Sequence, residues 1–110
     1  MKQATPLDKP YPQGFPDSFP FPPTTVIYHA EDRGQAGVIV TAVSADPFHK
    51  VLRFLNHDAV AAGFKVTSGE TEEHDAEANW TAASYTGRWA IRESGTCPAQ
   101  TLIQVVASKK

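Results

Sequence analysis

The residues of this chain that could do chemistry include four histidines and a dense run of carboxylates. The histidines are His29, His49, His57 and His74. Histidines that share a metal ion on one helix are commonly four residues apart. His49 and His57 are eight apart, which separates them by roughly 12 Å along a helix axis. Around His74 the alternating Asp or Asn ligands and the central glycine of a calcium loop are missing. We therefore predict no metal site and no cofactor.

Nucleophilic and nucleotide chemistry leave sequence signatures that this chain lacks. It contains no Gly-x-Ser-x-Gly elbow, no phosphate-binding loop and no dinucleotide fingerprint. Its single cysteine, Cys97, cannot form an internal disulfide. We interpret Cys97 as a half-buried small side chain, with a reactive thiol or a bridge between chains as alternatives. We predict no catalytic residues, so an enzyme is the weakest of three functional hypotheses.

The composition is that of an ordinary small globular protein. The chain has 110 residues, of which 41% are hydrophobic and 20% are charged, and its net charge is −2. A chain of this length can bury roughly two-thirds of its unfolded surface, which is enough for one core without metal or disulfides. The lack of a basic excess disfavours a nucleic-acid partner. No apolar run approaches the roughly 18 residues of a membrane span.

One amphipathic helix is predicted over residues 47–62. Asp46 can cap the free amides of the first turn, and Pro47 suits the first helical position. Gly63 is a natural stop, because it tolerates the left-handed conformation that follows many helices. Apolar side chains recur at the three- and four-residue spacing of one buried stripe, at Phe48, Val51, Leu52, Leu55, Ala59 and Ala62.

Strands are predicted on both sides of this helix from β-branched, aromatic and alternating segments. They cover residues 24–29, 38–43, 64–67, 74–82, 85–93 and 101–107. The first two form a hairpin around a glycine-containing turn. A tight turn at Ala83–Ser84 joins two strands whose buried positions are even in one and odd in the other. It places Asp75 opposite Arg92, Ala78 opposite Trp89 and Trp80 opposite Gly87, so acid faces base outside and small faces large inside.

The predicted fold class is α+β. We expect a mostly antiparallel sheet of about five strands, in the order β-β-α-β-β-β-β, with the helix packed on one face. Residues 24–107 form a single domain, preceded by an arm over 1–23 and followed by a loose end over 108–110. The other face of the sheet is a place where the arm could lie.

The arm holds seven of the nine prolines, which fix φ and push each preceding residue toward extended geometry. Large aromatic residues alternate with the prolines, at Tyr11, Phe15, Phe19 and Phe21. Left in water, these rings would form an exposed apolar patch. They therefore pack either on the chain's own domain or in the groove of a partner protein that recognises extended proline-rich chains.

The aromatic residues Trp80, Tyr85 and Trp89 fall on the predicted inner face of the sheet. Core packing under the helix explains them more simply than a platform for stacking a ligand. The alternative function is a small-ligand carrier, with a pocket between helix and sheet that is lined by Leu55, Trp80 and Trp89.

Several segments together resemble small uncharacterised bacterial α+β domains, which are often found after a signal or lipoprotein anchor. These segments are 19–23 (Phe-Pro-Phe-Pro-Pro), 61–64, 73–77, 87–92 and Cys97-Pro98. The resemblance implies an exported or lipoprotein-attached protein, and it implies no activity for particular residues. The first residues lack the apolar stretch of a secretory signal. We therefore expect a cytoplasmic protein or the mature part of an exported one.

The leading functional hypothesis is a non-enzymatic interaction or accessory module. It rests on the missing catalytic groups beside an unusually aromatic arm, and it assigns partner binding to Tyr11, Phe15, Phe19 and Phe21. The partner is another protein. The sequence leaves the oligomeric state open, because an exposed edge strand could pair with a second copy.

Overall fold

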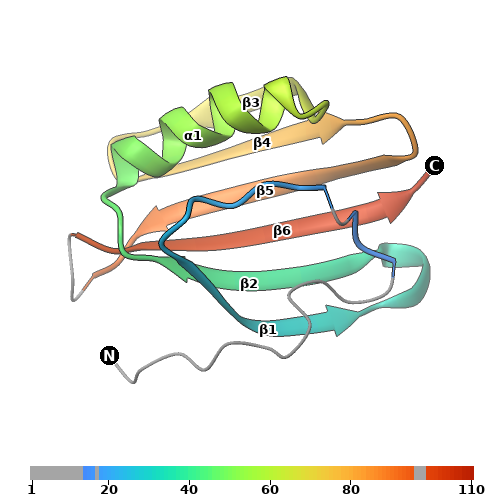
Figure 1. The fold of residues 1–110 in the computed structure, drawn as a ribbon, viewed down its shortest axis with the longest axis horizontal. Helices are drawn as coiled ribbons and strands as arrows, with labels where there is room; N and C mark the ends of the chain where they lie inside the picture. The colour runs from blue at the N-terminus through green and yellow to red at the C-terminus, as the bar shows by residue number, and fades with distance from the viewer. Residues whose placement is uncertain (1–13, 17, 96–98) are drawn as a thin grey trace.

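Six strands form one antiparallel sheet in the computed structural model, which describes residues 14–16, 18–95 and 99–110. The elements are β1 (Thr25–Asp32), the short 3-10 helix η1 (Gly34–Ala36), β2 (Val38–Ser44), α1 (Phe48–Ala61), β3 (Lys65–Thr71), β4 (Asp75–Thr81), β5 (Tyr85–Glu93) and β6 (Thr101–Lys109). The strands lie in the order β1-β2-β6-β5-β4-β3 (Figure 1). The predicted α+β class is confirmed, although the sheet has six strands instead of about five.

The pairing of β4 with β5 is the one predicted from alternation. Asp75 lies opposite Arg92, Ala78 opposite Trp89 and Trp80 opposite Gly87. Gly87 is required here because a Cβ atom would lie 2.5 Å from the Trp80 ring and 2.0 Å from the Val106 carbonyl oxygen. Small and large side chains therefore interlock within this pair, as the sequence indicates.

Four strands extend beyond their predicted ends, and β1 continues to Asp32, into the segment expected to form the hairpin turn. β3 continues to Thr71, four residues past the predicted limit, and pairs along its length with β4. The sequence suggests a loose end after residue 107, but Ser108 and Lys109 pair with Thr86 and Tyr85 of β5. This part of the prediction is wrong, because strand pairing holds residues that carry no apolar signal of their own.

The helix α1 buries one stripe and ends where the sequence indicates. Its buried side chains are Phe48, Val51, Leu55 and Ala59. Gly63 has φ +103°, the left-handed conformation expected of a glycine after a helix. The predicted cap is wrong, because the N-cap position is Pro47 and no side chain caps the first turn. The Asp46 carboxylate is bonded elsewhere.

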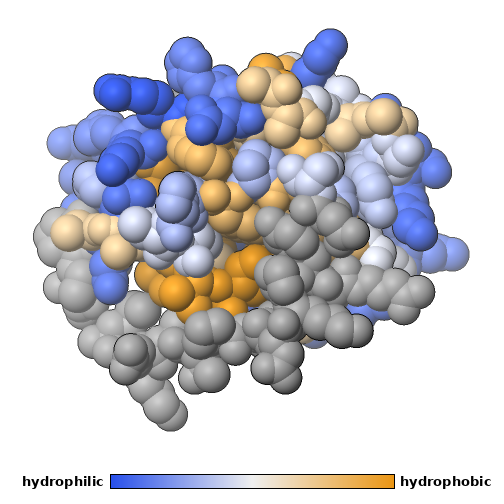
Figure 2. Space-filling view, viewed as in Figure 1, coloured by the Kyte–Doolittle hydropathy of each residue, from blue (hydrophilic) through white to orange (hydrophobic). Residues whose placement is uncertain are grey.

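The helix and the described part of the arm cover the same face of the sheet. Figure 1 shows α1 in front of β3 and β4, with the arm beside it crossing β5 and β6. Phe15 and Phe19 belong to the same core cluster as Val51 and Leu55 of α1. Figure 2 shows this covered face, with hydrophilic side chains around its upper rim and apolar ones toward its middle. The described part of the arm therefore shares the covered face with the helix.

Candidate functional site

The arm aromatics pack inside the protein. Phe15 is 3% exposed and Phe19 is fully buried, while Phe21 is partly buried against the core. The Phe19 ring lies 4.9 Å from that of Phe64 and 5.6 Å from that of Trp80, between ring centroids. Tyr11 lies outside the described residues. A partner groove could take the Phe15 and Phe19 rings only if the arm left the sheet.

The three residues predicted to line a ligand pocket fill the core instead. Leu55, Trp80 and Trp89 are 0%, 1% and 3% exposed. Phe64 and Trp80 meet edge to face at 5.3 Å between ring centroids. The indole N–H of Trp80 has no hydrogen-bond partner among the described residues, which is uncommon for a buried tryptophan. This close packing disfavours a ligand pocket between helix and sheet.

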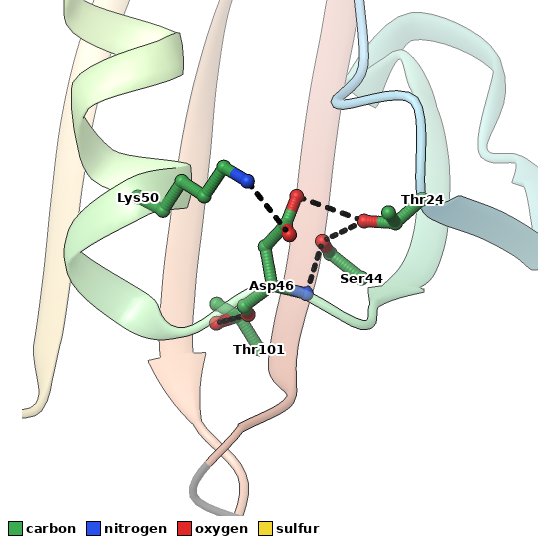
Figure 3. Close-up of polar contacts among 5 residues, drawn as sticks. All are labelled: Thr24, Ser44, Asp46, Lys50 and Thr101. Atoms are coloured by element: carbon green, nitrogen blue, oxygen red, sulfur yellow. Dashed lines mark hydrogen bonds and ion pairs between the residues drawn. The ribbon is translucent and has the colours of Figure 1, made fainter.

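A polar junction joins the end of the arm, the end of β2 and the start of α1 (Figure 3). The Thr24 hydroxyl donates to Asp46 Oδ2 at 2.9 Å and lies 2.9 Å from Ser44 Oγ. Because Thr24 has one hydroxyl proton, Ser44 donates to Thr24 while its own oxygen accepts the Asp46 N–H. Lys50 Nζ lies 3.4 Å from Asp46 Oδ1. Thr101 Oγ1 donates to the Asp46 carbonyl oxygen from the start of β6.

This polar junction has the properties of a structural joint. Ser44 and Thr101 are fully buried. The Ser44 hydroxyl is buried and bonded both as donor and as acceptor, and the Thr24 hydroxyl is bonded to Asp46, so both help to hold the three segments together. The junction connects residues that are far apart in sequence, and it explains why Asp46 does not cap α1.

His74 forms the clearest electrostatic interaction of the described residues. Its Nδ1 lies 2.8 Å from Glu93 Oε2, and its Nε2 lies 3.8 Å from Glu73 Oε1. The hydrogen bond to Glu93 and the charge of that carboxylate hold the pKa of His74 above its ordinary value of 6.5. The imidazole is exposed in the turn between β3 and β4, and no pocket surrounds it. This geometry favours a surface ion pair over an acid or base in catalysis.

The face of the sheet opposite α1 is open within the described chain. A depression of about 520 Å³ crosses it from Tyr28 on β1 to Glu70 on β3. Its floor is formed by side chains of the central strands, namely Thr41, Ala90, Leu102 and the polar Gln104. We call this surface the open face. Tyr28 reaches its rim because the register of β1 shifts between Ile27 and His29.

Charge is distributed unevenly over the open face. Four carboxylates from β3, β4 and the turn between them line one side of the depression, together with an arginine of β5; these residues are Glu70, Glu72, Asp75, Glu77 and Arg92. Arg88 forms an ion pair with Glu77. On β2 and β6 the same face carries half-buried apolar side chains such as Ile39, Leu102 and Val106. The open face is therefore more apolar on β2 and β6, and on β3, β4 and β5 it carries both charge signs, with carboxylates in excess around the depression.

Alternation in the sequence assigns most of these residues to the wet side of their strands. The depression itself was not predicted, because it depends on the strand order and on the β1 bulge that turns Tyr28 toward the rim. The described residues contain no group of three or more His, Cys, Asp or Glu side chains placed to hold a metal ion. No helix in this part of the chain is long and apolar enough to cross a bilayer.

Comparison of the chain with protein-family models, curated proteins and solved structures found no match to any of them. The resemblance to small bacterial domains therefore stays a prediction.

Proposed function

We propose that the chain is a non-enzymatic interaction module that binds another protein on its open face. The observation that carries the proposal is the depression of about 520 Å³ across a sheet face that the described chain leaves uncovered. Binding surfaces for proteins combine apolar and polar side chains in this way. The proposal keeps the interaction module expected from the sequence and moves its surface from the arm to the sheet.

The chemistry of the open face favours one kind of partner. Apolar side chains of β2 and β6 lie on one side of β5, and the carboxylates of β3 and β4 lie on the other. A partner that presents an apolar strip next to lysine or arginine side chains would match both sides. Opposite charges of this kind mainly raise the association rate and select the orientation of binding.

The other two functions have less support. A ligand carrier needs space between helix and sheet, where Leu55, Trp80 and Trp89 are packed. An enzyme has the support only of a second depression, of about 410 Å³, which Asp46, His57 and Asp58 line beside the polar junction.

Site-specific photo-crosslinking in cells tests the proposal. A photoreactive residue replaces Gln104, which is exposed on the open face, or Asn56, which is exposed on α1 as the control. We expect position 104 to give a discrete crosslinked protein and position 56 to give none. Equal crosslinking from both positions, or crosslinking from position 56 alone, would contradict the proposal.

The identified partner is then tested with purified proteins. Ala90→Arg places a long cationic side chain on the floor of the depression, and Ala83→Arg makes the same change in the exposed turn after β4. We expect Ala90→Arg to weaken binding by about tenfold or more, since tenfold corresponds to only about 1.4 kcal/mol. Ala83→Arg should bind as the unmodified protein does. Equal effects of the two changes would show that binding occurs elsewhere.

A further inference from the structure

The strand β3 forms one edge of the sheet and presents unpaired backbone groups. All seven of its residues are exposed, and it contains no proline. The Glu72 N–H donates to the Asp75 carbonyl oxygen in the turn that joins β3 to β4. Because backbone groups alternate in direction along an antiparallel strand, those of Gly69 and Thr71 point away from β4. An edge of this kind can add another strand.

A bulge in β3 decides which side chains share a face. Its register against β4 shifts between Val66 and Ser68. Lys65 and Glu70 are five residues apart, so in a regular strand they would lie on opposite faces. The bulge puts both on the open face, opposite Thr81 and Glu77 of β4. Val66 and Gly69 lie on the covered face, opposite Trp80 and Ala78.

The charges of Lys65 and Glu70 are not neutralised by an opposite charge within the described chain. Neither forms an ion pair with another described residue. Glu70 lies directly opposite Glu77, and like charges in that position destabilise a strand pair. Val66 is also 38% exposed, which is unusual for a large apolar side chain of this protein.

We propose that β3 pairs antiparallel with β3 of a second copy of this chain, around a twofold axis between Thr67 and Ser68. Lys65 of each copy then faces Glu70 of the other, which forms two ion pairs on the open face. Val66 of each copy faces Gly69 of the other, which leaves room for the valine side chain on the covered face.

The bulge selects this register over its neighbours. A shift of one residue in either direction sets Lys65 against Gly69 or Thr71 of the other copy. Gly69 and Thr71 lie on the covered face, since they pair with Ala78 and Ala76. In a shifted register an open-face residue of one copy would therefore be opposite a covered-face residue of the other. In the proposed register the two sheets join into one of twelve strands, and both open faces lie on the same side. This dimer does not depend on the proposed function.

Charge reversal with sedimentation velocity tests the dimer. In Lys65→Glu two glutamates face each other at both ion pairs, and in Glu70→Lys two lysines do. We expect each single variant to raise the dimer dissociation constant about tenfold or more, because each converts two attractive pairs into repulsive ones. The double variant K65E/E70K restores both attractions. Its dissociation constant should return to within about threefold of the unmodified value.

Mixing the two single variants gives the most specific result. In a mixed dimer every position 65 meets the opposite charge at position 70, so the mixture should dimerise although neither variant does so alone. Arg53→Glu, on the exposed side of α1, changes the net charge by the same amount as Lys65→Glu and should leave the dimer intact. Circular dichroism should show the same fold for all variants.

Three results would overturn the proposal. The unmodified chain could stay monomeric up to millimolar concentration, which would leave the β3 edge to a strand from a different protein or to solvent. All variants could dimerise equally, which would place the contact on another surface. The mixture of single variants could stay monomeric, which would contradict the register.

Discussion

His74 lies in the turn between β3 and β4, where Glu93 at the end of β5 holds its imidazole at 2.8 Å. This contact raises the pKa of His74 above 6.5 in the folded state. A histidine with a raised folded-state pKa contributes stability that is fully present below pH 6.5. That stability is lost as the pH rises through the folded value.

We therefore predict that His74→Gln destabilises the protein more at pH 5.5 than at pH 8.5. Urea unfolding at the two pH values measures the difference. Glu93→Gln removes the main partner and should reduce the pH dependence of the His74→Gln effect, and the charges of Glu73 and Asp75 leave the remainder. An effect of His74→Gln that is the same at both pH values would show that the contact does not form in solution.

Phe19 is the residue that makes the arm part of the core. Its ring contacts those of Phe15, Phe21, Phe64 and Trp80. Removing such a ring leaves a cavity that the surrounding side chains fill only in part.

We predict that Phe19→Ala lowers the free energy of unfolding by about 3–5 kcal/mol, measured by urea denaturation. Tyr28→Ala is the control, since it removes a ring that is 38% exposed, and it should cost well under half as much. A loss below about 1 kcal/mol for Phe19→Ala would mean that the arm does not stabilise the domain.

Among the elements, the β4–β5 pair illustrates how far local pattern predicts structure. Its register follows from alternation and from one tight turn, which are both properties of neighbouring residues. Gly87 belongs to that pattern, because the Trp80 ring and the Val106 carbonyl leave no room for a side chain there.

We predict that Gly87→Ala destabilises the protein by about 1–3 kcal/mol through overpacking. Gly95→Ala is the matched control, since nothing lies within 4 Å of the added methyl position. Thermal unfolding of the two variants measures the difference. Similar melting temperatures would show that β5 can shift to accept the methyl group.

Other elements depend on contacts that local pattern does not contain. The position of Asp46 just before α1 predicts a helix cap, but its carboxylate instead accepts a hydrogen bond from Thr24 and forms an ion pair with Lys50. The bulges in β1 and β3 change which side chains share a face, and neither has a turn residue that marks it. β1 and β3 differ from β4 and β5 in lying at the two edges of the sheet, and not in the types of residue that they contain.

On the scale of the whole molecule, the sequence predicts the fold class and most of the core but not the open face that we propose as a binding surface. The helix stripe and the inner tryptophans are buried as expected. The sequence alone leaves two packing sites for the arm aromatics, this core or the groove of a partner protein, because large apolar rings can be buried in either. The open face required the strand order, which brings Thr41, Gln104 and Ala90 side by side from three separate strands.

The position of β6 has a consequence for how the protein is made. It is the last of these strands to be synthesised, yet it lies between β2 and β5. Until it emerges, the β1–β2 hairpin and the β3–β5 meander each expose an inner edge to solvent or to a chaperone. The sheet cannot close before β6 is made, so the nascent chain is open to wrong strand pairing until then.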